Sequence, residues 1–494
     1  MIWLAISPII IPLSSAILLV LFRKSRSQQV LSLIGAGVFF VHTVLLLIDI
    51  SRSGMEVVRI GNWPAPYGIT LVIDLFSAIM ITVTGFIGLN IALYALSDID
   101  RERSRFGFHP LMHVLLMGVC GAFMTGDLFN LYVWFEVMLM SSFVLMALGG
   151  ERTQIEGAVK YVSLNFIASV IFLTAIGIIY GKTGSLNMAD LALKIGGNES
   201  GPMVKSATML LLGAFGIKAG IFPFFFWLPA SYHTPPATVS ALFAGLLTKV
   251  GVYAMIRIFT LVFAYEVTGL TKMLLIIISA FTMVTGVLGA AAQYEIRKIL
   301  AFHIISQIGY MILGLALFTP LAMAAAIFYL VHHIIVKTNL FLIGGLIGHI
   351  KGSYDLKKIG GLYLTHPLLA VVFLIPALSL GGIPPLSGFF AKFTIIKAAL
   401  NVESYLIVFV ALAVSVLTLY SMTKIWAEAF WNTGPEVQPA GRAMPILMLI
   451  PIILLAAATI GIGFFPDTLL QYSHRAAEQL FDRGAYIRNV LGVY

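Results

Sequence analysis

Apolar runs of about 20 residues recur along the whole chain and are separated by short polar or charged stretches. A helix needs about 20 apolar residues to cross roughly 30 Å of hydrocarbon, so the pattern predicts an all-α polytopic membrane protein. We expect about fourteen transmembrane spans, at residues 2–22, 30–49, 70–96, 109–126, 128–148, 156–180, 205–232, 236–258, 271–292, 297–317, 320–347, 366–400, 404–430 and 443–465.

Two of these spans are interrupted by proline and glycine, and each carries one lysine near its break. They are the span 205–232, with Pro223 and Lys218, and the span 366–400, with Gly381–Pro385 and Lys392. Breaks inside the membrane are tolerated where protein or a wet cavity satisfies the freed backbone groups. Paired interruptions in corresponding places are typical of transporters built from repeated halves.

The paired breaks therefore predict a division of the chain into repeats. The expected units are an N-terminal three-helix segment at 1–108, five-helix repeats at 109–258 and 271–430, and the last transmembrane helix with a C-terminal amphipathic tail at 443–494. In that tail, apolar residues recur at helical spacing with charges opposite, which predicts an interfacial or partner-docking helix. They are Leu469, Leu470, Ala476, Ala477, Leu480 and Phe481.

Composition supports the membrane class and explains the net charge. Hydrophobic residues make up 60% of the chain and charged residues 10%, which excludes an ordinary soluble domain. The net charge of +9 does not indicate nucleic-acid binding, because the basic residues follow alternate spans. They are Arg23, Lys24, Arg26, Arg101, Arg103, Arg105, Arg152, Arg297, Lys298, Lys351, Lys357 and Lys358. The positive-inside rule places these loops inside and both termini outside, although the opposite loop 181–204 also carries two lysines.

Charged residues in the middle of apolar spans are the candidate chemistry, because an intramembrane charge is costly and usually handles ions or protons. Glu136 lies midway along its span and must be protonated or paired with a cation, for which we expect Lys218. The alternative for this pair is a structural ion pair that fixes helix packing. Lys249 lies too deep in its span to reach the interface by snorkelling, which favours a proton carrier.

One predicted helix carries a polar line. Tyr329, His333 and Lys337 are spaced at i, i+4 and i+8, so they share a helix face and are candidates for a proton relay. His332 points about 100° away and is interpreted as a packing residue with a satisfied hydrogen bond. No metal site is predicted, because two imidazoles without a nearby carboxylate or thiolate make a poor ligand set.

Three further residues are less clear-cut. Lys392 either completes the pathway or reaches the interface from its helix end, and the repeat argument favours the pathway. Asp74 opens its span and fits an interfacial or loop-organising acid, and Lys160 lies one turn into its span and fits either role. A line of protonatable groups across the interior predicts proton movement. Its members are Glu136, Lys218, Lys249, His333, Lys337 and Lys392.

Several stretches carry a family resemblance that covers roughly residues 70–430. The chain resembles the proton-translocating, antiporter-like subunits shared by respiratory complex I, membrane-bound hydrogenases and Mrp cation/proton antiporters. The stretches are KAGIFPFFFWLPASYHTPPATVSALFAGLLTKVGVY, IRKILAFHIISQIGYMILG, VHHIIVKTNLFLIGG and SLGGIPPLSGFFAKF. Within that family the chain is most similar to the D subunits of Mrp antiporters, through KYVSLNFIASVIFL, YGKTGSLNMADL and AYIRNVL.

The resemblance implies a fourteen-helix fold with two inverted five-helix repeats. It also implies that Glu136 and Lys218 form the family's pair, that Lys249 and His333 connect, and that Lys392 is the terminal lysine, where some relatives carry glutamate. The implied function is that of a proton-translocating subunit of a multisubunit Na⁺ (or other monovalent cation)/H⁺ antiporter in a bacterial or archaeal plasma membrane. Its partners would be other hydrophobic subunits, membrane lipid, protons and the cation, and it would be a secondary transporter without cofactors.

Two alternatives stay open at this point. The same type of subunit pumps protons in redox complexes such as NADH:quinone oxidoreductase or membrane-bound hydrogenase, whose soluble partners would hold the cofactors. A polytopic enzyme acting on lipid is the second alternative. It would need a polar catalytic cluster at an interface, and the loops of this chain are short and poor in acids.

Overall fold

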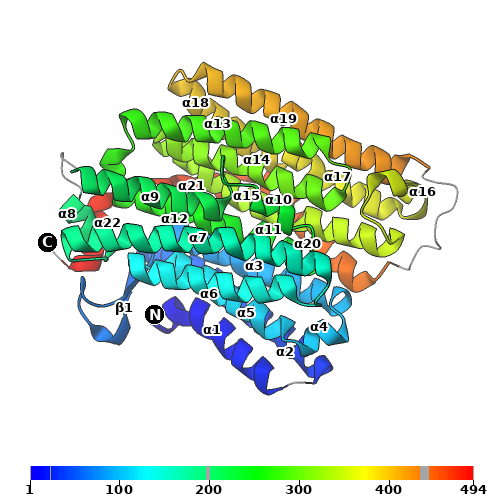
Figure 1. Ribbon diagram of the computed structural model, residues 1–494, viewed down its shortest axis with the longest axis horizontal. Helices are drawn as coiled ribbons and strands as arrows, with labels where there is room; N and C mark the ends of the chain where they lie inside the picture. Colours follow the sequence, from blue (N-terminus) through cyan, green and yellow to red (C-terminus); the bar gives the residue numbers. More distant parts are fainter. Residues whose placement is uncertain (1, 23, 196–200, 434–443, 493–494) are drawn as a thin grey trace.

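The computed structural model describes residues 2–22, 24–195, 201–433 and 444–492. Figure 1 shows long helices lying side by side, with their axes roughly parallel. Among the described residues, eleven helices are long and apolar enough to cross a membrane, and α5 and α17 are shorter apolar helices. The predicted class, an all-helical polytopic membrane protein, is confirmed at this level. Arg23 and residue 443, which entered the predictions above, lie outside the described residues.

The helices follow the predicted spans closely. In chain order they are α1 (Ile2–Leu21), α2 (Ser25–Ser53), α3 (Leu75–Asp98), α4 (Arg101–Arg105), α5 (Phe108–Met124), α6 (Leu128–Ala147), α7 (Arg152–Thr183), α8 (Met188–Ile195), α9 (Pro202–Ala219), α10 (Trp227–Ser231), α11 (Ala237–Gly245), α12 (Leu247–Leu261), α13 (Gly269–Ala292), α14 (Ile296–Leu317), α15 (Pro320–Lys351), α16 (Leu362–Thr365), α17 (Pro367–Gly381), α18 (Ser387–Asn401), α19 (Tyr405–Trp426), α20 (Ile446–Phe464), α21 (Pro466–Phe481) and α22 (Arg483–Leu491).

The structure interrupts the chain at both predicted breaks. Helix α9 ends at Ala219 and α17 ends at Gly381, and each is followed by a glycine with positive φ, Gly220 at 74° and Gly382 at 90°. A left-handed residue after the last turn ends a helix, and glycine adopts that conformation at no steric cost. A further interruption at Leu246 separates α11 from α12, in the span that we predicted to be continuous over 236–258.

The predicted span 70–96 begins too early, because residues 70–73 form a strand. Strand β2 (Thr70–Ile73) pairs antiparallel with β1 (Glu56–Arg59). Helix α3 begins after Asp74, whose side chain accepts a hydrogen bond from the Ser77 N–H while the Ser77 hydroxyl accepts one from the Asp74 N–H. This capping box fixes the start of α3.

Helix α15 forms the centre of the bundle. Its apolar stretch is wholly buried, and α14, α11, α18, α20 and α21 pack around it. The C-terminal helix α21 was expected to lie at an interface or dock on a partner, but its apolar face packs on α15, α3 and α12 of the same chain. Phe481 of α21, for example, lies edge-on to Phe318 with ring centroids 5.2 Å apart.

The two ends of the described chain lie at the same end of the bundle, close to β1, α8 and α22 (Figure 1). The short helices α4 and α16, which neighbour predicted basic loops, lie at the opposite end. The polar connections are therefore sorted to the two ends of the helices, and the buried charges discussed below lie on the helices between them.

Close packing of α13 on α14 gives a test of the fold. A Cβ added at Gly286 would clash with the backbone of Ser306, whereas one at Gly177 of α7 would meet nothing within 4 Å. We expect Gly286→Ala to destabilise the protein by about 1–3 kcal/mol through overpacking. Gly177→Ala should be neutral or slightly stabilising. Thermal unfolding in mild detergent measures both, and equal midpoints would contradict the packing described here.

Candidate functional site

Three helices bring Glu136 and Lys218 together through a serine. Lys218 is buried at the end of α9 and donates a hydrogen bond of 3.0 Å from its Nζ to Ser169 Oγ on α7. Ser169 Oγ in turn donates a short hydrogen bond to the Glu136 carboxylate on α6. The predicted pair is therefore bridged by a hydroxyl, which accepts from the lysine and donates to the acid.

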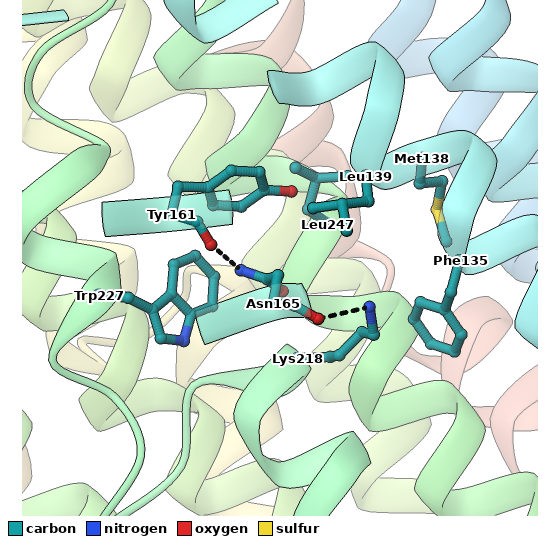
Figure 2. Close-up of a pocket in the computed structure, with 8 residues that line it drawn as sticks. All are labelled: Phe135, Met138, Leu139, Tyr161, Asn165, Lys218, Trp227 and Leu247. Carbon is teal, nitrogen blue, oxygen red and sulfur yellow. Dashed lines mark hydrogen bonds between the residues drawn. The ribbon is translucent and has the colours of Figure 1, made fainter. Parts of the chain in front are cut away.

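A small cavity lies beside this bridge (Figure 2). The Lys218 ammonium points between the Asn165 carbonyl oxygen, at 3.5 Å, and the face of the Phe135 ring, whose centroid is 5.1 Å away. The cavity offers about 20 Å³ to the centres of water molecules, which is enough for about one water. Tyr161, Trp227 and Leu247 complete its polar and apolar walls, and Figure 2 shows them around the lysine.

Lys249 is fully buried at the unpredicted helix break. Its Nζ donates a short hydrogen bond to the carbonyl of Ala244, in the last turn of α11. Carbonyl groups at the end of a helix lack intrahelical partners and carry partial negative charge, so they suit an ammonium. Gly251 lets α12 approach α9 beside Lys218, since a Cβ there would lie 2.7 Å from the Ala219 nitrogen. The two lysines are thus on closely packed helices.

The polar line on α15 is buried along its length. Lys337 Nζ donates to the Leu300 carbonyl of α14 at 3.1 Å. His333, one turn earlier, interacts electrostatically with both Lys249 and Lys337, and its two ring nitrogens have no hydrogen-bond partner within the described protein. Tyr329 donates to Gln307 Oε1 at 2.5 Å. The three predicted residues therefore continue from Lys249 into the second half of the chain.

Lys392 ends the line and is buried within the protein. Its Nζ donates to the Gly381 carbonyl at 3.1 Å, across the break between α17 and α18, and lies 5.3 Å from the Tyr310 ring centroid. His332 packs between the same helices, with Nδ1 hydrogen-bonded to Ser387 Oγ at 2.8 Å. His332 Nε2 has no hydrogen-bond partner within the described protein, so the satisfied hydrogen bond expected for this residue is present at Nδ1 alone.

Asp74 and Lys160 lie away from this line. Asp74 forms a buried bidentate ion pair with Arg257 of α12, with N–O distances of 2.6 and 2.8 Å. Lys160 is about half exposed and pairs with Glu156 at 2.5 Å. The first residue joins two helices, and the second lies at the protein surface.

Two members of the site were not predicted from the sequence. His303 on α14 is fully buried, has no hydrogen-bond partner within the described protein for either ring nitrogen, and interacts electrostatically with Lys337 and Lys392. A histidine inside an apolar span was a signal that could have found it. Ser169 gave no such signal, because a serine within a membrane helix commonly bonds its own backbone. The Asn165 carbonyl lies 3.1 Å from Ser169 Oγ and is the alternative acceptor for its single hydroxyl proton.

The site offers lysine, histidine, carboxylate and hydroxyl groups, and these can hold and pass protons. Among the described residues, no three His, Cys, Asp or Glu side chains lie close enough together to hold a metal ion. Lys249, Lys337 and Lys392 donate their hydrogen bonds to main-chain carbonyls, so their charge states are not fixed by matching acids.

Comparison with known proteins identifies the family. Residues 125–418 match the family described as NADH:quinone oxidoreductase/Mrp antiporter, transmembrane. This chain belongs to that family. Over 489 residues it is 47% identical to the D subunit of the Na⁺/H⁺ antiporter of Alkalihalophilus pseudofirmus, covering 99% of both chains. The predicted similarity to the D subunits of Mrp-type antiporters is confirmed, and so is the prediction of a transporter component rather than an enzyme.

Solved structures agree with this assignment. A chain in the structure of the Mrp complex from Dietzia sp. is 34% identical, with a TM-score of 0.93 over 99% of both chains. A chain of the archaeal membrane-bound sulfane sulfur reductase, a respiratory membrane complex, is 27% identical, with a TM-score of 0.90 over 99% of both chains. The antiporter and redox branches of the family therefore share one fold.

The serine bridge predicts a measurable effect. Ser169→Ala removes the hydroxyl that joins Glu136 to Lys218, so proton transport by the assembled complex should fall by about tenfold or more. Thr174→Ala is the matched control, because Thr174 lies on the same helix, is exposed, and bonds only the Val170 carbonyl in the contacts described. Cation-dependent proton movement in membrane vesicles measures both variants. Equal rates for Ser169→Ala and the unmodified protein would show that the bridge is dispensable.

Proposed function

We propose that this chain conducts protons along the line of Glu136, Lys218, Lys249, the His333–Lys337 pair and Lys392, in which Glu136 is partly exposed and the other residues are buried. The observation that carries the proposal is the excess of buried cationic groups over acids on closely packed helices. Each lysine has an oxygen acceptor but no direct carboxylate partner among the described residues. Such groups can release and take up protons, whereas a fully paired lysine would be held charged.

The residues have different roles in this proposal. Glu136, through Ser169, biases the charge of Lys218 at one end. Lys249 and the His333–Lys337 pair relay the change, since neighbouring lysines repel one another when both are charged. Lys392 exchanges protons at the other end. One charge that crosses a membrane potential of 100 mV gains or loses about 2.3 kcal/mol. This is comparable to the free energy that changes the pKa of a lysine by nearly two, at about 1.36 kcal/mol for each pKa unit.

Water molecules complete the path in this proposal. Buried polar groups without a protein partner are usually satisfied by ordered water. Helices α14 and α15 carry several such groups. They are the ring nitrogens of His303 and His333, the Gln307 amide nitrogen, the Asn339 amide and the Thr338 hydroxyl. We therefore expect hydration to be concentrated there.

Proton flow would be exchanged for Na⁺ or another monovalent cation within a complex of several hydrophobic subunits in the plasma membrane. The names of the bacterial antiporter relatives support this reading. The redox alternative is less well supported, because the relative in the sulfane sulfur reductase is 27% identical and the antiporter relative is 47% identical.

The finer architecture belongs to the same proposal. The eleven long apolar helices, in which α11 and α12 count as one, make fourteen crossings together with α5 and the two interrupted segments α9–α10 and α17–α18. We propose inverted repeats at 109–258 and 271–430, flanked by the segments 1–108 and 443–494, with both termini outside. The common position of the two chain ends and the basic loops at the other end support this topology.

Substitution of the two lysines at the helix breaks tests the proton path. Lys218→Ala and Lys392→Ala should each lower Na⁺-dependent proton movement by about a hundredfold or more, since each removes a positioned proton-transfer group. Lys182→Ala is the control, because Lys182 is exposed on the end of α7. The assay uses vesicles that contain equal amounts of assembled complex. If both lysine variants kept antiport, the proposed path would be wrong.

Co-purification tests the proposed partners. A tagged chain extracted in mild detergent should bring with it only hydrophobic membrane subunits, identified by mass spectrometry. Cys-rich or nickel–iron-binding soluble subunits among the companions would instead place the chain in a redox-driven complex.

A further inference from the structure

A second cavity, of about 500 Å³, opens on the face that carries the basic loops. Helix α10 packs on both α7 and α14, and the cavity is lined by these three helices and the turns beside them. Its charged and titratable lining residues are Glu156, Lys160, His233 and Lys298. The proton path proposed above uses none of these residues.

Lys298 brings an unpaired positive charge to this cavity. Its side chain is half-buried and forms no hydrogen bond or ion pair within the described residues, although it acts electrostatically on Glu295 and His233. The adjacent Arg297 is held elsewhere, because it pairs with Glu295 at 3.3 Å and donates to the Pro235 carbonyl at 3.1 Å. A half-buried ammonium group without a partner gains free energy when an anionic ligand accepts its hydrogen bonds.

The residues that line the cavity carry one net positive charge. Lys160 pairs with Glu156 at 2.5 Å, so these two charges balance and the charge of Lys298 remains. His233 is neutral at pH 7, because burial and the nearby cations, Lys298 first among them, lower its pKa to about 4. Its Nδ1 lies 2.8 Å from the Pro229 carbonyl, which can only accept, so Nδ1 carries the proton and Nε2 is an acceptor. The cavity therefore fits a ligand with one negative charge and with hydroxyl donors.

A row of phenylalanine rings leads from the cavity along the apolar part of the protein. Phe226 is exposed, lines the cavity and stacks on Phe225 with ring centroids 4.4 Å apart. Phe225 stacks on Phe222 at 6.5 Å, and Phe222 stacks on the exposed Phe281 at 5.0 Å. Phe281 lies halfway along α13. The row therefore offers a hydrocarbon chain a continuous apolar surface from the cavity to mid-depth.

We propose that this cavity binds the headgroup of an anionic phospholipid of the phosphatidylglycerol type, whose acyl chain lies along the row of phenylalanine rings. The phosphate accepts hydrogen bonds from Lys298 and from Lys160 on the α7 wall. The hydroxyls of the glycerol headgroup donate to Glu156 and to His233 Nε2. The proposed topology places this face inside, where basic pockets between membrane helices suit anionic headgroups.

The apolar row favours a lipid over a free phosphate ion, because the ion would occupy only the polar part of the site. This inference goes beyond the proposed function and does not depend on it, since lipid binding is measured without transport.

Photolabelling of the purified complex is the first test. The probe is phosphatidylglycerol with a photoreactive diazirine on its acyl chain, added in mild detergent after the native lipid has been washed out. We expect mass spectrometry to find the label on the segments that contain Phe226 and Phe281. Lys298→Gln should lower this labelling by about tenfold, because the phosphate loses a charge-assisted hydrogen bond.

Lys358→Gln is the matched control, because Lys358 is 72% exposed in another of the basic loops and does not line the cavity. Its labelling should equal that of the unmodified complex. Absence of the label from both segments, or equal labelling in the Lys298→Gln complex, would overturn the proposal.

Competition distinguishes a lipid from a free anion. Unlabelled phosphatidylglycerol should displace the probe, whereas inorganic phosphate should not, because it cannot occupy the apolar row. Phosphatidylcholine should displace the probe less well, since its headgroup adds a positive charge and has no hydroxyl donors. Displacement by inorganic phosphate to the same extent as by the unlabelled lipid would assign the site to a free anion and overturn the lipid.

Shortening of one ring tests the apolar part of the site. Phe226→Ala should lower the labelling of the segment around Phe281 severalfold, because the acyl chain loses part of its contact surface. Phe409→Ala is the control, since Phe409 is an equally exposed ring on α19 that does not line the cavity. Thermal unfolding checks that both complexes are folded. Equal labelling in the two variants would show that the chain does not follow the phenylalanine row.

Discussion

A buried ammonium group must find oxygen acceptors, and this requirement links the helix breaks to the lysines. Lys249 bonds a carbonyl in the last turn of α11, and Lys392 bonds the final carbonyl of α17. Lys218 itself lies in the last turn of α9. Carbonyl groups at a helix end are free of intrahelical bonds and carry partial negative charge, so an interrupted helix supplies an acceptor without supplying a countercharge. The interruptions are therefore part of the site and do more than bend the chain.

The contrast with Asp74 and Arg257 shows why this matters. That pair is bidentate, buried and further held by the Tyr253 hydroxyl at 2.9 Å, so removal of either partner would leave an uncompensated charge. The pair joins α3 to α12. Its two opposite charges stabilise one another, so neither Asp74 nor Arg257 is expected to change its protonation. The lysines of the central line bond neutral carbonyls or a hydroxyl, which leaves their protonation open to their neighbours. Fixed and changeable charges are thus distinguished by the kind of acceptor.

Much of the fold and the site could be predicted from the sequence, because membrane helices and intramembrane charges leave strong local signals. The lysines, Glu136 and the breaks at Pro223 and Gly381–Pro385 are visible in a single chain. The break at Leu246 is not, because only Gly245 precedes it and the interruption depends on packing. The packing of α21 on its own chain also could not be predicted from the sequence, because an amphipathic pattern does not show which surface covers the apolar face.

The Ser169 hydroxyl lies between Glu136 and Lys218, so each of these charged groups can affect the other without direct contact. A direct buried ion pair would hold the lysine charged, since separation of the pair is costly. A serine that accepts from the ammonium and donates to the carboxylate transmits the charge of one to the other, and it can also turn its single proton to the Asn165 carbonyl, 3.1 Å away. Because Ser169 bonds both Lys218 and Glu136, this one side chain would couple the protonation of Lys218 to the charge of Glu136.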